Sequence, residues 1–271
     1  MTHRKYLKSK KKIVIKVGTS LLAYNNGLLN LDRMEKLVRV IADLQNSGKE
    51  IILVSSGAVA VGMGILGLNE RPEETAKKQA LAAVGQPALI RLYQKFFDEY
   101  NKIVAQVLLT RDGIENNVRR INARNTLKEL VGMGIIPIVN ENDTVITEEI
   151  EFGDNDFLSA KVATLVKAEL LLILTDTDGV YTADPHKDES AKKVRKVMNA
   201  NDDLKDVDVD GSSKLGRGGM ASKISAAELC REHNVDVVIT DGENPSKIRE
   251  VLEGKDLGTF FVSESTDQMA D

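Results

Sequence analysis

Short apolar runs rich in β-branched residues alternate with segments of helical periodicity, and this alternation constrains the fold of the chain more than any other feature. Several runs are apolar at consecutive positions, which is typical of strands buried on both faces of a parallel sheet. Parallel neighbours need long crossover connections, and the helical segments supply them. The pattern predicts one α/β domain, a three-layer αβα sandwich with a mainly parallel central sheet. The predicted strands are residues 12–17, 50–56, 102–110, 135–139, 170–175, 235–240 and 259–262.

Helical spacing is clearest between the first two strands. Asp32 and Glu35 are predicted to form a capping box, and Gly48 is predicted to end the helix. A second helix begins near Ala76 and is expected to break at residues 85–87, where Pro87 would open a new one. Residues 119–134 and 221–233 provide further crossovers. The buried face of the first helix is predicted to be Met34, Leu37, Val38, Ile41 and Leu44.

Composition and charge exclude several classes of protein. No window approaches the roughly eighteen apolar residues of a membrane span, and the basic N-terminus lacks the apolar run of a secretory signal. We therefore expect a cytoplasmic protein with no membrane partner. Cys230 is the only cysteine and is predicted to lie in the core, while the histidines at 3, 186 and 233 share no metal-ligand spacing. The net charge is −4, so no nucleic-acid partner is expected, and the basic residues 1–11 are predicted to form a solvated tail.

Polar, glycine-containing turns follow the predicted strands at their carboxyl ends. The first strand ends at Lys16 in "KVGTS", and the second is followed by Ser55, Ser56 and Gly57. "NENDT" (140–144) and "DTDGVYTADP" (176–185) follow two more strands. Because ligands bind at the carboxyl ends of parallel strands, these turns are expected to gather at one rim. Their glycines would let backbone N–H groups approach a phosphate closely.

Several familiar motifs fail on inspection. "GMGILG" (62–67) has the glycine spacing of a dinucleotide site, but it does not directly follow a strand. "DVDVDG" (206–211) begins like a calcium loop, but its twelfth position is Arg217 instead of glutamate. "GRGGMASK" (216–223) lacks the order of a Walker motif. No histidine base or cysteine nucleophile stands in a convincing setting. The glycine turns, serines, lysines and carboxylates that remain suit phosphoryl transfer, in which Lys16 and Lys223 would converge on a polyphosphate.

The ordered motifs resemble those of the glutamate 5-kinase family, within the amino acid kinase superfamily. They are "KIVIKVGTSLL", "ILVSSGAVAVG", "KQALAAVGQPALI", "INARNTL", "IIPIVNENDTV", "GDNDFLSA", "LLILTDTDGVYTADP" and "GRGGMASK", spread between residues 12 and 262. The resemblance implies the αβα fold already predicted. It also implies ATP-dependent phosphorylation of the side-chain carboxylate of L-glutamate, giving L-glutamyl 5-phosphate on the way to proline.

The resemblance also implies roles for individual residues. Lys16 and Lys223 would neutralise the transferring phosphoryl group, and Asp156 would hold both lysines. Glutamate would be gripped by Ser56, Asp143 and Asn155, with Asp154 lining the same pocket. A structural alternative, in which Asp154 or Asp156 caps the following helix, is compatible with these roles. Mg²⁺ would bind through nucleotide phosphates and water, with no assigned residue. Gly57 would also line the substrate pocket, with its backbone near the phosphates. Residues implied to bind ATP are Lys16, Gly18, Thr19, Thr175, Asp176, Arg217, Gly218, Gly219, Met220, Ala221, Ser222 and Lys223.

The chain departs from the family pattern in two places. Arg217 stands where threonine is common, and Ala221-Ser222 replaces Ser-Thr before Lys223. Many relatives carry a PUA domain, whereas here a kinase domain over residues 12–263 is expected to end in a polar tail, 264–271. The family further implies proline as a feedback inhibitor, a homo-oligomer (dimer or tetramer) and contact with the next enzyme of the pathway.

Other functions stay open on the sequence alone. The acceptor could be N-acetylglutamate, aspartate, carbamate or UMP. The chain could also be a non-catalytic amino acid sensor, or bind nucleic acid through its basic N-terminus.

Overall fold

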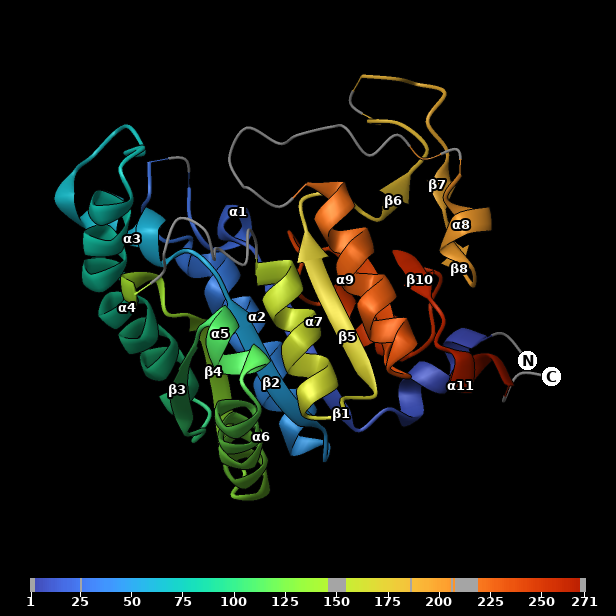
Figure 1. Ribbon diagram of the computed structural model, residues 1–271, viewed down its shortest axis with the longest axis horizontal. Coiled ribbons are helices and arrows are strands. Elements are labelled where there is room, and N and C mark those ends of the chain that lie inside the picture. The colour runs from blue at the N-terminus through green and yellow to red at the C-terminus, as the bar shows by residue number, and fades with distance from the viewer. Residues whose placement is uncertain are drawn as a thin grey trace.

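A mainly parallel sheet forms the centre of the molecule in a computed structural model that describes residues 3–24, 26–145, 155–185, 187–205, 207 and 219–268. Within these residues, eight strands follow the order β3-β4-β2-β1-β5-β9-β10-β8 (Figure 1). Every neighbouring pair is parallel except β9 and β10. The strands are β1 (Lys12–Val17), β2 (Glu50–Ser55), β3 (Val104–Leu109), β4 (Ile136–Glu141), β5 (Leu170–Thr175), β8 (Lys196–Val197), β9 (Asp236–Asp241) and β10 (Thr259–Phe261).

All seven predicted strands are present, with ends that shift by at most two residues. The sequence reading missed β8 and the small antiparallel pair β6 (Val180–Tyr181) and β7 (Lys193–Val194). Each of these strands is two residues long, too short to show the alternation on which strand prediction depends.

Helices cover both faces of the sheet, which confirms the three-layer sandwich. One face packs against α1 (Thr19–Leu22), α2 (Leu31–Asn46), α4 (Thr75–Asp98) and α10 (Lys247–Leu252). The other face packs against α5 (Arg111–Glu115), α6 (Asn117–Gly132), α7 (Asn155–Leu165) and α9 (Met220–Glu232). The remaining elements are η1 (His3–Ser9), α3 (Ala58–Leu66), η2 (Asp143–Val145), α8 (Ala200–Asp203) and α11 (Glu264–Gln268).

The predicted break in the second helix is wrong, because α4 runs unbroken through Pro87. Gly85 serves close packing instead of a break. A Cβ on Gly85 would lie 1.9 Å from the carbonyl oxygen of Ala58 in α3, and a Cβ on Gly62 of α3 would lie 2.0 Å from the carbonyl oxygen of Leu81 in α4. The two helices therefore cross with their backbones almost in contact, which glycine alone permits.

The predicted capping box is also wrong. Helix α2 begins two residues earlier than the Asp32–Glu35 pair would place it, and its N-cap is Asn30, whose side chain accepts a hydrogen bond from the Arg33 backbone N–H at 3.0 Å. The predicted apolar face of α2 is fully buried, and Gly48 follows the helix with a left-handed φ of 87°.

A solvated tail was predicted for residues 1–11, but the described N-terminal residues pack against the domain, as do those of the polar C-terminal segment. In η1, Arg4 and Leu7 are buried, and Arg4 donates hydrogen bonds to the backbone oxygens of Leu257 and Gly258. In α11, Thr266 is buried and donates to Asp236 at 2.8 Å. Figure 1 shows η1 and α11 next to each other beside the sheet. The packing of η1 was not evident from the sequence, because a single leucine and the apolar stem of an arginine provide most of its buried surface.

Candidate active site

Two lysines from distant parts of the sequence contact one buried carboxylate. Lys16 Nζ lies 2.5 Å from Oδ1 of Asp156, and Lys223 Nζ lies 3.1 Å from Oδ2 of the same residue. All three side chains are buried, with exposures of 3% for Lys16, 0% for Asp156 and 7% for Lys223. The structure therefore brings together the three residues that the sequence nominated as catalytic.

The direction of each side chain follows from its element. Along β1, Ile13, Ile15 and Val17 face the layer that contains α2 and α4. Side chains alternate along a strand, so Lys16 faces the opposite layer, which contains α7 and α9. Asp156 is the second residue of α7, where the positive end of the helix dipole favours a carboxylate. Lys223 is the fourth residue of α9.

Ser222 adds a hydroxyl group to the same carboxylate. Its Oγ donates to Oδ2 of Asp156 at 3.1 Å. The residues before it, Gly219, Met220 and Ala221, form the N-cap and the first turn of α9. The nucleotide contacts expected of this segment remain a prediction.

A second polar network surrounds Asn155, the first residue of α7. Its Nδ2 donates to the Ser55 carbonyl at 2.9 Å, to Ser56 Oγ at 2.8 Å and to Oδ1 of Asn140 at 3.0 Å. Asn140 in turn donates to Gln86 of α4 at 2.7 Å. The ends of two strands, β2 and β4, together with helices α4 and α7 thus fix the orientation of the Asn155 amide.

Sequence reasoning missed Asn140 and Gln86. Asn140 opens the "NENDT" segment, which was noted as polar, but only Asp143 was selected from it. The detectable signal was an asparagine directly after a predicted buried strand, because a buried amide needs hydrogen-bonding partners. Gln86 carried no such signal, since its position was interpreted as a helix break.

Asp143 lies in η2, which packs against α4. Burial raises the pKa of its carboxyl group to about 6, and the charge of Arg71 only partly opposes that rise. A partly buried carboxylate of this kind gains from a cationic ligand group, because an ammonium nearby would favour its ionised form.

The turns after β1, β2 and β5 lie at the same rim. Gly57 has a φ of 101° and is the N-cap of α3, and a Cβ built there would lie 3.8 Å from Thr19. A Cβ on Gly18 would lie 3.6 Å from Nζ of Lys16, so the β1 turn passes directly over that ammonium group. Thr175 is buried at the end of β5 and donates to the exposed Asp176 at 3.0 Å.

Three of the predicted site residues, Asp154, Arg217 and Gly218, lie outside the described residues. Among the residues that are described, no group of three histidine, cysteine, aspartate or glutamate side chains could hold a metal ion. Cys230 is buried, as predicted, and burial raises the pKa of its thiol to about 12.

Comparison with known proteins places this geometry in a family. The sequence model of the amino acid kinase family matches residues 11–241. The chain belongs to the amino acid kinase family. Nothing in the described part of the molecule is both apolar enough and long enough as a helix to cross a bilayer.

Curated members of the family align along almost the whole chain. A glutamate 5-kinase of Clostridium perfringens is 50% identical over 264 residues, covering 96% of this chain and 98% of that protein. A glutamate 5-kinase of Listeria monocytogenes is 48% identical, with 96% of each chain covered. The resemblance drawn from the motifs is thereby confirmed.

Solved structures support the fold. A UMP kinase of Bacillus anthracis has a TM-score of 0.62 at 21% identity, covering 94% of this chain and 97% of that one. An isopentenyl phosphate kinase of T. acidophilum has a TM-score of 0.65 at 15% identity, covering 93% and 100%. At these identities, the likeness concerns the amino acid kinase fold and not the acceptor.

Proposed function

We propose that the protein transfers the γ-phosphoryl group of ATP to the side-chain carboxylate of L-glutamate, giving L-glutamyl 5-phosphate, the first step toward proline. The support is twofold. Relatives named glutamate 5-kinase are about half identical over 96% of the chain. The observation that carries the chemistry is the pairing of two buried ammonium groups with the single carboxylate of Asp156.

The reaction needs charge neutralisation more than proton transfer. The side-chain carboxyl of glutamate has a free pKa of about 4.3, so it is ionised at neutral pH and needs no general base. It must nevertheless approach an anionic phosphoryl group. Two unit negative charges 4 Å apart repel by about 4 kcal/mol at an effective dielectric constant of about 20. Cations fixed in a buried site offset that repulsion without reorganising during the reaction.

Lys16 and Lys223 fit this task. Two ammonium groups for one carboxylate leave an excess of one positive charge within the triad. Asp156 contacts both ammonium groups, so both nitrogens would face the transferring phosphoryl group from fixed positions. Lys16 would approach the phosphates beneath the Gly18–Thr19 turn, and Lys223 would approach them from α9.

The acceptor would bind beside this triad. Ser56 and Asn155, joined by a 2.8 Å hydrogen bond, would hold the polar groups of glutamate. Asp143 would pair with the substrate ammonium, which would favour the ionised form of its partly buried carboxyl. Thr175 and Asp176 would contact the nucleotide, together with the segment from Arg217 to Ser222.

Magnesium fits the nucleotide better than the protein. The carboxylate nearest the reaction, Asp156, is already engaged by two lysines, and no cluster of three suitable ligands occurs among the described residues. Mg²⁺ would therefore bind mainly through ATP phosphates and water, where it would supply further positive charge.

The same proposal includes feedback inhibition by proline and assembly into a dimer or tetramer. It also includes contact with the next enzyme of the pathway and a cytoplasmic location. A kinase domain spanning residues 12–263 is part of it as well. Feedback by proline is tested by measuring the phosphoryl-transfer activity at saturating proline, which we expect to be lower than the activity without proline.

An acceptor panel tests the proposed function. ATP turnover would be measured with glutamate, N-acetylglutamate, aspartate, carbamate and UMP, and acyl phosphates would be trapped with hydroxylamine. We expect a hydroxamate with glutamate at the highest kcat/KM. UMP as the preferred acceptor, which forms no hydroxamate, would refute the proposal, as would glutamate binding without turnover, the behaviour of a sensor.

A further inference from the structure

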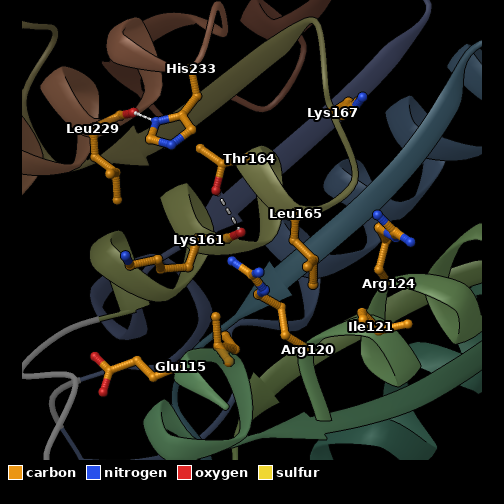
Figure 2. A pocket seen from close by; sticks show the side chains of 11 residues that line it. Glu115, Arg120, Ile121, Arg124, Lys161, Thr164, Leu165, Lys167, Leu229 and His233 are labelled. Carbon is orange, nitrogen blue, oxygen red and sulfur yellow. Dashed lines mark hydrogen bonds between the residues drawn. The ribbon is translucent and has the colours of Figure 1, made fainter. Parts of the chain in front are cut away.

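A cavity of about 460 Å³ lies between α6 on one side and α7 and α9 on the other, away from the candidate active site. Figure 2 shows its lining side chains, with the Arg120 side chain reaching from α6 toward α7. Its volume is in the range of small-molecule sites, roughly 300–1,000 Å³. Its lining includes four apolar residues, Ile114, Ile121, Leu165 and Leu229.

The cavity is distinct from the kinase site. Asp156 is the second residue of α7 and Leu165 is the last, a separation of about 14 Å at 1.5 Å per residue. Lys223 and His233 are similarly separated along α9. The cavity therefore adjoins the carboxyl-terminal ends of the two helices whose opposite ends carry the triad.

Positive charge dominates the lining. The lining contains four cationic residues, Arg120, Arg124, Lys161 and Lys167, and one acid, Glu115, so it carries a net charge of +3 although the whole chain carries −4. Glu115 itself pairs with Arg111 outside the cavity, at 2.9 Å, and Figure 2 shows its carboxylate turned away from the other labelled residues. Within the described part of the chain, none of the four cations forms a salt bridge.

Interactions within α6 explain this arrangement only in part, because Arg120 donates a hydrogen bond to Oδ1 of Asn117 at 3.0 Å. Arg120 lies in the first turn of α6, where the helix dipole disfavours a cation. Arg120 and Arg124 are four residues apart, and like charges at that spacing destabilise a helix by about 0.2–0.5 kcal/mol. Neighbouring Arg119 is different, because it pairs with Asp112 at 2.5 Å. A bound anion would turn the unfavourable charges of the other two arginines into favourable ones.

We propose that this cavity binds a small phosphorylated compound with an apolar or ring-shaped part. The arginine pair would bind the phosphate through guanidinium forks, which suit phosphate oxygens. Lys161 would add positive charge from the α7 side. The apolar lining residues would contact the apolar or ring-shaped part of the ligand. His233 lines the same cavity.

Phenyl phosphate is a suitable probe, because it joins a phosphate to an apolar ring. Its binding to the full chain would be measured by calorimetry, with the kinase site blocked by saturating glutamate and a non-hydrolysable ATP analogue. We expect measurable affinity, at least fivefold tighter than that of inorganic phosphate. Equal affinities would overturn the assignment of an apolar ligand part, and no binding would overturn the site.

Matched variants locate the binding. The double variant R120Q/R124Q should bind phenyl phosphate at least tenfold more weakly, while R119Q, on the same helix but outside the cavity, should change the affinity less than twofold. Undiminished binding in R120Q/R124Q would contradict the proposal. Both variants should keep the ATP turnover of the parent protein with glutamate, so that failure of this proposal and failure of the kinase function remain distinguishable.

Discussion

Asp156→Asn is the sharpest test of the triad, because it removes one charge and almost no volume. The two lysine nitrogens contact opposite oxygens of this carboxylate, which limits their separation to about 8 Å. At an effective dielectric constant of about 20, their repulsion is then at least about 2 kcal/mol, with no carboxylate to offset it. We expect the ammonium groups to move apart and lose their fixed direction.

Two measurable quantities follow. Removing one member of a buried ion pair costs about 3–5 kcal/mol of folding free energy, which corresponds to a melting temperature lower by roughly 5–15 °C. Because a domain has about 5–15 kcal/mol of stability, most of the variant should remain folded at 25 °C. Loss of fixed charge at the transferring group should lower kcat by at least about 10³-fold, or roughly 4 kcal/mol.

The control is the same substitution in an exposed pair. Asp32 contacts Lys36 at 2.7 Å on α2, with side-chain exposures of 73% and 55%. Such pairs contribute at most about 1 kcal/mol, so Asp32→Asn should leave both kcat and the melting temperature almost unchanged. Hydroxamate assays at 25 °C and circular dichroism melts would be run on both variants. A folded Asp156→Asn protein with kcat within threefold of the parent would refute the reasoning.

Three further predictions concern other residues. Burial raises the pKa of Asp143 to about 6 from an unfolded value of 3.8, so the folded state holds this proton more tightly and its contribution to stability falls as pH rises through that range. Asp143→Asn should therefore raise the melting temperature at pH 7, measured by calorimetry, and abolish the increase in KM for glutamate expected of the parent below pH 6. Asn140→Ala should remove one acceptor from the Asn155 amide and raise KM for glutamate about tenfold in steady-state assays, with a smaller effect on KM for ATP. Gly85→Ala should lower stability by about 1–3 kcal/mol in urea melts because its Cβ meets the α3 backbone at 1.9 Å, whereas Gly132→Ala, with nothing within 4 Å, should not.

The fold was readable because its main signal is local. The central strands are apolar on consecutive residues, as in β5, where all six residues are buried. That run predicts a strand between two helical layers without knowledge of any long-range contact. The error at Gly85 has the opposite origin. A glycine two residues before a proline is a local sign of a break, but here the close approach of α3 decides the outcome, and that approach is invisible in a linear sequence.

The residues of the site also differ in whether the local sequence could identify them. Lys16 was identifiable from its place near the end of a predicted strand, and Asp156 from its place at a predicted helix start. Their pairing with Lys223 rested on the family resemblance and the expected topology. Asn140 and Gln86 escaped notice because their importance lies in hydrogen bonds to other elements, which residue type alone does not specify.

Convergence of the triad follows from the handedness of the parallel sheet more than from any single contact. Right-handed crossovers place the starts of the helices that follow parallel strands at the carboxyl rim. Strand β1 lies between β2 and β5 at the middle of the sheet, so Lys16 emerges beneath the starts of α7 and α9. Asp156 and Lys223 then need only side-chain length to reach it. Because the backbone sets these positions, substitutions such as Asp156→Asn should change the charge of the site and leave its architecture in place.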